Sequence, residues 1–167
     1  KNSEAGSHVK DNIEAVDEAL RLLRDLSVDL RPPVLDDLGL VTALRWYADR
    51  FARRTGLDIE VIVDLPDHDR RFSRELETAC FRIAQEAITN VARHAKASQI
   101  LVQLAREGNV LVLIVKDDGV GFDLDYLRKR APRATLGLVS MQERANAAGG
   151  TIEIESVDGN GTEIRFT

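Results

Sequence analysis

Apolar and polar residues alternate along this chain with two different periods, and each change of period marks a new element. From residue 10 to residue 30, apolar side chains recur at steps of three and four, with charged residues between them. This spacing gathers the apolar side chains on one face and predicts an amphipathic helix. Residues 31–33, Arg-Pro-Pro, end it, because proline cannot continue a helix and disfavours helical geometry in the residue before it.

The rest of the chain switches between helical and strand patterns, with Gly, Pro and Asp at the breaks. Helices are predicted over about 38–55, 74–96 and 138–148, and strands over about 59–63, 99–105, 110–116, 151–157 and 162–166. The predicted caps and stops are Asp36 or Asp37, Gly56, Ser73 with Glu77, and Gly149 with Gly150. The order of elements predicts an α+β fold, a two-layer α/β sandwich preceded by a helical segment.

Size and composition set limits on this picture. The 167 residues suffice for one domain of ordinary size with a helical extension. A net charge of −5 argues against a nucleic-acid surface, and no apolar run reaches the roughly 20 residues of a membrane helix. The single cysteine, Cys80, falls among apolar residues at helical spacing and is expected to be a core thiol. Lys1 in place of an initiator Met predicts a piece of a longer protein, and Gly6-Ser7-His8 is typical of a cloning scar.

The predicted helix over 74–96 carries a polar stripe. Glu86, Asn90 and His94 are spaced by four and stack along one face, while Arg93 leans to the same side. The amide oxygen of Asn90, together with phosphate oxygens, would be a sufficient ligand set for Mg²⁺, which prefers oxygen ligands and keeps several waters. For this helix taken alone, a solvated polar face is an equally good interpretation.

Glycine-rich turns follow, and the first comes after a strongly apolar strand. Asp117 at the end of that strand can accept a hydrogen bond from an exocyclic amine and so discriminate adenine from guanine. Gly119 and Gly121 allow the backbone to approach a flat ring closely. An ordinary Asp-Gly hairpin turn is the alternative interpretation.

Two more glycine motifs complete the order. Gly137 precedes the last predicted helix, whose unpaired amides would form an anion site, although a plain helix start fits as well. Residues 159–162, Gly-Asn-Gly-Thr, are by themselves a better hairpin signal than a binding signal. The succession of the four motifs in this order is what favours a metal-bound nucleotide.

The order Glu-x-x-x-Asn, Asp-x-Gly-x-Gly, Gly-Leu and Gly-x-Gly-Thr resembles the N box and glycine boxes of the ATP-binding (Bergerat-type) fold shared by sensor histidine kinases, the Hsp90 chaperone, type II topoisomerases and MutL. Residues 30–40, Leu-Arg-Pro-Pro-Val-Leu-Asp-Asp-Leu-Gly-Leu, and 137–144, Gly-Leu-Val-Ser-Met-Gln-Glu-Arg, are similar to the sensor kinases that pair with LuxR-type response regulators. The resemblance covers the chain from about residue 10 to its end.

The resemblance implies an ATP-binding catalytic domain over 32–167, which transfers the γ-phosphoryl of Mg-ATP to a histidine on a separate helical dimerisation domain. It implies that Asn90 is the magnesium ligand, that Glu86 orients or activates the acceptor, and that Arg93 and His94 reach toward the phosphates. Phosphoryl transfer relies mostly on positioning and charge neutralisation, so no covalent nucleophile is required.

For the base and the lid, the resemblance implies further roles. Asp117 reads adenine, Gly119 and Gly121 shape the pocket, and Thr162 lies near the base. The remaining two positions, at the hinge of a lid, are Gly137 and Leu138. Residues 123–135 are polar and without a period, as expected for this lid, and their basic residues are more typical of a solvated cluster than of a phosphate contact: Arg128, Lys129, Arg130 and Arg133.

The chain departs from this family in one respect. The phosphoacceptor of this family lies on a helix in a motif of the form Leu-His-Asp, and none of the three histidines fits it: His8 stands in Ser-His-Val-Lys, His68 in a polar loop and His94 in the expected nucleotide site. Residues 1–31 resemble part of the second dimerisation helix, so we expect ATP binding without self-phosphorylation. The implied partners are ATP, a histidine-bearing dimerisation helix and a LuxR-type regulator, in the cytoplasm, with membrane anchoring of the full-length protein left open. The alternatives are an ATPase of the chaperone or topoisomerase type and an anti-sigma-type serine kinase or binding module.

Overall fold

The computed structural model describes residues 33–66, 71–124 and 136–167. The helix predicted over 10–30 lies outside these residues, and so does all but the beginning of the predicted lid over 123–135. No helix in the described part of the chain is both long and apolar enough to cross a bilayer.

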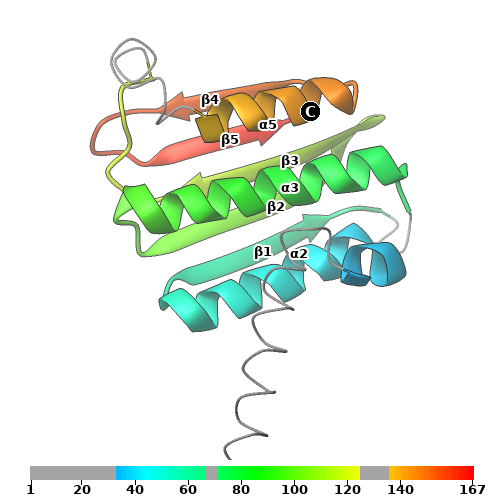
Figure 1. The fold of residues 1–167 in the computed structure, drawn as a ribbon, viewed down its shortest axis with the longest axis horizontal. Helices are drawn as coiled ribbons and strands as arrows, with labels where there is room; N and C mark the ends of the chain where they lie inside the picture. Colours follow the sequence, from blue (N-terminus) through cyan, green and yellow to red (C-terminus); the bar gives the residue numbers. More distant parts are fainter. Residues whose placement is uncertain (1–32, 67–70, 125–135) are drawn as a thin grey trace, which may run out of the picture.

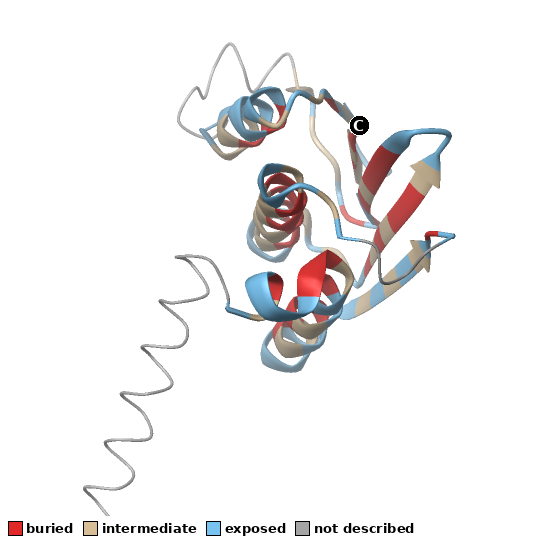
Figure 2. Cartoon of the chain, turned by 90° about the vertical axis from the view of Figure 1, so that its right-hand side faces the viewer, coloured by how far each residue is buried: buried red, intermediate tan, exposed pale blue. Residues whose placement is uncertain are grey.

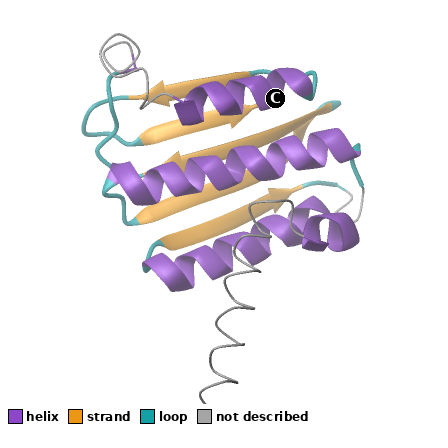
Figure 3. Ribbon diagram, viewed as in Figure 1, coloured by secondary structure: helices purple, strands orange, loops and turns teal. Residues whose placement is uncertain are grey.

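The described residues form two layers, one of helices and one of strands (Figure 1). The elements in chain order are α2 (Pro33–Thr55), β1 (Asp58–Asp64), α3 (Arg74–Asn90), the π-helical turn η1 (Val91–Ala95), β2 (Gln99–Glu107), β3 (Val110–Asp117), α5 (Leu136–Ala147), β4 (Ile152–Ser156) and β5 (Thr162–Phe166). Figure 3 shows the three helices side by side across the sheet, and the edge-on view of Figure 2 shows them all on one face. The predicted α+β sandwich is confirmed.

The five strands follow the order β1-β2-β3-β5-β4. β1 pairs with β2 in parallel, and the other three pairs are antiparallel. Short turns that contain glycine join β2 to β3 and β4 to β5, and the first of them includes Gly108, which has a φ of 62°. The third antiparallel pair, β3 with β5, forms between strands that α5 and β4 separate in sequence. The parallel pair requires a crossover, and α3 supplies it by passing over the sheet between β1 and β2. This topology places α3 over the middle of the sheet, where it contacts β3.

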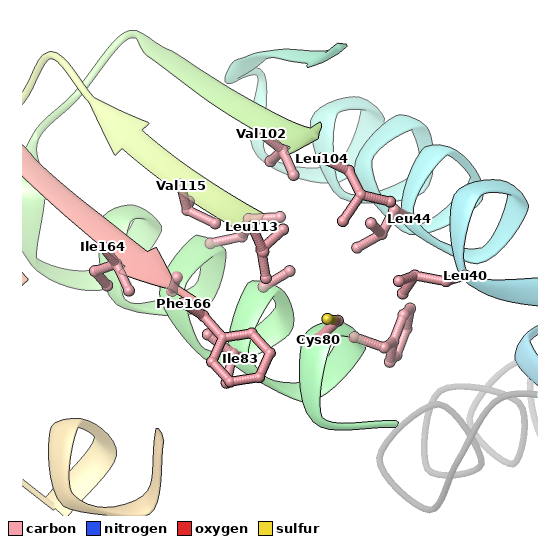
Figure 4. Close-up of a cluster of buried hydrophobic side chains, with 14 of the residues drawn as sticks. Leu40, Leu44, Cys80, Ile83, Val102, Leu104, Leu113, Val115, Ile164 and Phe166 are labelled. Atoms are coloured by element: carbon pink, nitrogen blue, oxygen red, sulfur yellow. The ribbon is translucent and has the colours of Figure 1, made fainter. Parts of the chain in front are cut away.

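Side chains between the two layers form a single core. Strand residues on the face that meets the helices are almost all aliphatic, for example Leu104 and Leu113 (Figure 4). Phe166 of β5 and Phe81 of α3 are buried in the same core, and the ring of Phe81 packs edge-on against Tyr47 of α2. Figure 4 shows Cys80 inside this cluster, and its thiol is 0% exposed. Burial raises the pKa of that thiol, because a thiolate has no water to solvate it there. The prediction of a core thiol is confirmed.

Helix α2 starts earlier than predicted and is interrupted. It begins at Pro33, at the position where a missing amide hydrogen matters least, and not near Leu38. Gly39 interrupts it with φ 81° and ψ 176°, a conformation open to glycine alone, so a first turn over 33–38 is followed by a longer segment that ends at Thr55. Gly56, with φ 77°, ends the helix as predicted.

The predicted helix over 74–96 is correct in extent but not in geometry. Ser73 caps its start, because its hydroxyl accepts a hydrogen bond from the amide of Leu76 at 3.3 Å. The α-helix ends at Asn90, however, and Val91–Ala95 continue it as one wider π turn that ends at Lys96 in the left-handed conformation. Such turns are rare and cluster at functional sites. The regular four-residue stacking expected from Asn90 to His94 therefore does not hold.

Helix α5 begins two residues before the predicted position. It starts at Leu136, so Gly137 lies inside its first turn and does not precede it. The amide of Gly137 still belongs to the first turn, where backbone N–H groups lack helical partners. The amides expected to bind an anion therefore still belong to the start of this helix, but the helix begins at Leu136 and includes Gly137.

Candidate nucleotide-binding site

A pocket of about 260 Å³ opens where α3 and its π turn face the ends of β3 and β5 and the first turn of α5. This volume is at the lower end of the range for ligand pockets, about 300–1,000 Å³, and suits a flat heteroaromatic ring better than a whole nucleotide. Its walls are mostly apolar, with a few polar groups among them. The lining residues are Ala87, Asn90, Val91, His94, Ala95, Asp117, Gly121, Phe122, Leu138, Thr162 and Ile164.

Asp117 is the buried charge of this pocket. It is the last residue of β3, pairs with Thr162 of β5 in the sheet, and is only 6% exposed. Burial raises the pKa of its carboxyl, while the amides of Gly119 and Thr162 lower it by donating hydrogen bonds. The Gly119 amide donates to Oδ1 at 2.8 Å, which fixes the plane of the carboxylate. Asp117 is thus a fixed acceptor in an apolar pocket, suited to a ligand N–H.

The adjacent Asp118 has a different task. It is exposed, and its two carboxylate oxygens accept hydrogen bonds from the Ser98 amide at 2.8 Å, the Ser98 hydroxyl at 2.6 Å and the Gln99 amide at 2.9 Å. These hydrogen bonds lower the pKa of Asp118, the hydroxyl contributing most. Asp118 therefore ties the end of β3 to the start of β2. Of two consecutive aspartates, only the first lines the pocket.

Gly119 packs against the end of the π turn behind the pocket. A Cβ at this position would lie 2.4 Å from the carbonyl oxygen of Ala95, which real Cβ atoms do not approach so closely. The same carbonyl accepts the Val120 amide at 2.8 Å. Gly119 thus allows the loop after β3 to close over the end of the helix, and it shapes the pocket without lining it. Its approach is to Ala95 and the Asp117 carboxylate, whereas a direct approach to a flat ring was expected.

Gly121 lines the pocket and is confined on its other side. Its φ is 63°, and a Cβ there would lie 2.0 Å from the carbonyl oxygen of Val157. The hydroxyl of Ser156 connects the glycine loop to the β4–β5 hairpin. It accepts a hydrogen bond from the Phe122 amide at 2.9 Å and lies 2.9 Å from the hydroxyl of Thr162. The β4–β5 hairpin and the glycine loop therefore form one wall.

The opposite wall joins α3 to α5 through Glu86, Asn90 and Gly137. A Cβ at Gly137 would lie 2.3 Å from Oε1 of Glu86 and 3.2 Å from Nδ2 of Asn90. The absence of a side chain at Gly137 therefore lets the first turn of α5 approach both polar groups. Asn90 lines the pocket, whereas Glu86 and Gly137 lie beside it. In the described part of the chain, the side chain of Asn90 makes no capping hydrogen bond to the π turn, and it lies at the lining of the pocket, where a ligand can reach it.

The π turn separates the two basic residues of the N box. His94 is exposed and lines the pocket, while the exposed Arg93 does not line it. Six of the ten residues expected at the site thus line one pocket, and Glu86, Arg93, Gly119 and Gly137 adjoin it in sequence or space. Their individual roles stay predictions. Ile164, which lines the pocket, and Ser156 belong to no glycine box, so the motifs do not point to them. Phe122, which also lines the pocket, directly follows the second glycine of the Asp-x-Gly-x-Gly box.

The layers, the crossover helix and the apolar pocket with one buried carboxylate define an ATP-binding domain of the kind found in sensor histidine kinases. Residues 75–167 match the family model described as histidine kinase-, DNA gyrase B-, and HSP90-like ATPase. The chain therefore belongs to this family.

Curated relatives agree with this assignment. The sensor histidine kinase MctS of Rhizobium johnstonii is 41% identical over 150 residues, which is 90% of this chain and 32% of the relative. LiaS of Bacillus subtilis is 40% identical over 88% of this chain and 39% of its own length, and DegS of Brevibacillus brevis is 34% identical over 96% and 40%. The chain thus spans about a third to two fifths of the length of these relatives.

Solved structures show the same fold. The histidine kinase domain of the blue-light activated histidine kinase of Erythrobacter litoralis superposes with a TM-score of 0.60 at 22% identity, over 76% of this chain and 59% of that one. Full-length ShkA in complex with AMPPNP gives a TM-score of 0.61 at 21% identity, over 75% of this chain and 29% of that one. At this level of identity, the likeness concerns the fold.

Proposed function

We propose that this domain binds Mg-ATP and transfers its γ-phosphoryl to a histidine on a separate dimerisation helix, from which it passes to a LuxR-type response regulator. Residues 1–31 would be part of the second dimerisation helix, and residues 32–167 the catalytic domain. Because ATP is available in the cytoplasm, we expect the domain to work there, whether or not the whole protein is anchored to a membrane.

The observation that carries this proposal is Asp117 in its apolar pocket. A buried carboxylate is costly unless its acceptor capacity is used. The Gly119 amide engages Oδ1, and the exocyclic amine of adenine would be a matching donor for the remaining capacity of the carboxylate. Guanine carries a carbonyl oxygen at the equivalent place, and two acceptors would face each other. The pocket thus favours adenine.

The phosphate end is assigned to the junction of α3 and α5. Asn90 supplies an uncommitted amide beside the Glu86 carboxylate, and these are oxygen donors that suit Mg²⁺. When bound, the ion would neutralise charge on the phosphates. Asn90 would hold it, Glu86 would orient the acceptor imidazole or accept its proton, and the first-turn amides of α5 near Gly137 would face the phosphates.

The names of the curated relatives support the phosphoacceptor, and the resemblance of residues 30–40 and 137–144 supports the LuxR-type regulator. MctS, LiaS and DegS carry the name of sensor or signal-transduction histidine kinases. The residues Arg-Pro-Pro at 31–33 mark the start of the domain, and this motif has no role in an ATPase of the chaperone or topoisomerase type. We therefore expect phosphoryl transfer only when an acceptor-bearing helix is supplied.

The test is calorimetric titration of this chain with ATP and with GTP, each with and without Mg²⁺. We expect magnesium-dependent, adenine-selective binding that Asn90→Ala abolishes when Mg²⁺ is present. Asn146→Ala is the matched control, because Asn146 is an exposed residue of α5 that does not line the pocket. Equal binding of ATP and GTP would refute the assignment of the base pocket.

A second assay separates the kinase from an ATPase. Radiolabelled γ-phosphate is followed onto a dimerisation domain of a related kinase that carries the acceptor histidine. Label on that histidine supports the proposal. Steady hydrolysis of ATP without any labelled acceptor would favour an ATPase of the chaperone or topoisomerase type.

A further inference from the structure

The break in α2 lies at the start of the nucleotide-binding domain, and backbone carbonyls just before it receive their hydrogen bonds from outside the helix. Residues 33–38, here called the leading turn, are helical, and Gly39 then departs from helical geometry. The last carbonyls of a helical segment have no partner within it. Leu35 and Asp36 lie in this position, and Leu35 is fully buried. Their carbonyl oxygens therefore need donors from elsewhere in the fold.

Arg71, which precedes α3, supplies those donors. Its Nη1 donates to the carbonyl oxygen of Asp36 at 3.2 Å, and its Nη2 donates to that of Leu35 at 3.3 Å. Gly39 makes room for this arrangement, because a Cβ there would lie 3.3 Å from Cδ and Nε of Arg71. One guanidinium thus caps the leading turn across the break.

Glu77 of α3 fixes the same guanidinium. Nε of Arg71 donates a hydrogen bond to Oε1 of Glu77 at 3.0 Å, and Nη2 donates one to Oε2 at 2.9 Å. This two-point contact sets the plane of the guanidinium. The Glu77 side chain is 2% exposed and also accepts the Phe72 amide at 3.1 Å. If Arg71 moved away, Glu77 would be left as a buried charge without a partner, which would strongly destabilise the folded chain. The ion pair between Arg71 and Glu77 is therefore expected to persist.

These contacts connect two parts of the molecule that serve different purposes. The leading turn follows directly on residues 1–32, and the far end of α3 carries Asn90. We propose that Arg71, held by Glu77, is a positioning residue that fixes the leading turn on α3 and so sets the direction in which the segment before residue 33 leaves the nucleotide-binding domain. This inference rests on the proposed function, because it matters only when that preceding segment presents a phosphoacceptor.

Only arginine has enough donors, in a fixed plane, to make the hydrogen bonds of Arg71 to Glu77 and to the two carbonyls. Lysine would keep a positive charge near Glu77, but its single ammonium group cannot serve both carboxylate oxygens and both carbonyls. Arg71→Lys therefore keeps the charge balance of the core and releases the leading turn. The other ion pair in this region, Arg74 with Asp36 at 3.8 Å, is exposed and contributes little to holding the turn.

The experiment uses the whole kinase for kinetics and this chain for hydrogen exchange, with Arg71→Lys, Arg71→Gln and Glu77→Gln. Arg165→Gln is the matched control, because Arg165 makes a two-point contact with Glu107 at 2.7 and 2.8 Å on the sheet. For Arg71→Lys we expect kcat of histidine phosphorylation to fall about tenfold, with KM for ATP changed by less than about twofold. Amides of the leading turn should exchange about tenfold faster.

The two readouts separate this inference from the proposed function. Unchanged kcat in Arg71→Lys with faster exchange would overturn the positioning role, and unchanged exchange would overturn the cap itself. If Arg71→Gln fails to fold, Arg71→Lys still decides the question. A wild-type chain that binds no ATP contradicts the proposed function, and the exchange rates of the leading turn then still test the contact between Arg71 and the turn.

Discussion

The substitution Asp117→Asn tests the base pocket most directly, because it removes a charge and almost no volume. The carboxylate is 6% exposed, so a hydrogen bond to a ligand amine forms away from water. A hydrogen bond to a charged group contributes about 1.5–3 kcal/mol, which corresponds to about 10- to 150-fold in the dissociation constant. The asparagine oxygen can still accept the Gly119 amide, which now donates at 2.8 Å. We therefore expect ATP affinity to fall by this factor while the fold is kept.

Stability provides an independent check on the same variant. Asparagine relieves the desolvation of a buried charge but loses acceptor capacity toward the two amides, so the changes oppose each other. We expect the free energy of unfolding to change by less than about 1 kcal/mol in a urea titration. Asp118→Asn is the matched control, and it should lower stability while leaving ATP affinity unchanged. Calorimetry would refute the reasoning if Asp117→Asn bound ATP as tightly as the parent, or if both variants lost affinity equally.

Three further outcomes are expected. Gly121→Ala should lower the free energy of unfolding by about 2–4 kcal/mol in urea, because its Cβ would meet the Val157 carbonyl at 2.0 Å and its φ is 63°; an unchanged midpoint would contradict this. Cys80 should react with a thiol reagent only as fast as the chain unfolds, since it is 0% exposed; reaction in the native state would disprove its burial. ATP affinity should weaken as pH falls through the raised pKa of Asp117, because protonation removes the acceptor, and Asp117→Asn should show no such dependence.

The sign of the stability dependence differs between the two neighbouring aspartates. Burial raises the pKa of Asp117 in the folded state, so the folded chain holds a proton that the unfolded chain has released, and its contribution to stability rises as pH falls. Hydrogen bonds lower the pKa of Asp118, so its contribution is lost as pH falls through the acidic range. The free energy of unfolding would be measured against pH for the parent chain and for each Asn variant. The difference between the parent and Asp117→Asn and the difference between the parent and Asp118→Asn should change with pH in opposite directions.

Much of the fold could be predicted because local patterns and tertiary packing agree. The alternation around Ile59, Val61 and Val63 indicates one face on the core, and β1 occupies this stretch. The apolar run before Asp117 predicts a buried strand, and β3 lies inside the sheet. Positive φ at Gly108 and Gly159 marks the hairpins at the expected places. In each case a single physical requirement, burial or turn geometry, decides the structure.

The errors occur where distant residues decide. Nothing in residues 91–95 distinguishes a π turn from an α turn, and its geometry is set together with the docking of the Gly119 loop on Ala95. Glu77 was interpreted as part of a helix cap, and it does accept the Phe72 amide, but its main partner is Arg71. Ile164 lines the pocket but lies outside the motifs, and the pairing of β5 with β3 brings it there, which no local pattern reveals.

The strand order has a consequence for how this domain assembles. The β2–β3 and β4–β5 pairs are hairpins between neighbours in sequence, whereas β1 joins β2 only after the whole of α3 has been traversed. Contacts close in sequence form faster, because less chain entropy is lost before they are made. The pocket depends on the β3–β5 pair, in which Asp117 meets Thr162, and α5 and β4 separate these two strands in sequence. We expect the two hairpins to form first, and the nucleotide pocket to be complete only when β5 pairs with β3, so that the pocket reports the finished sheet and not an early intermediate.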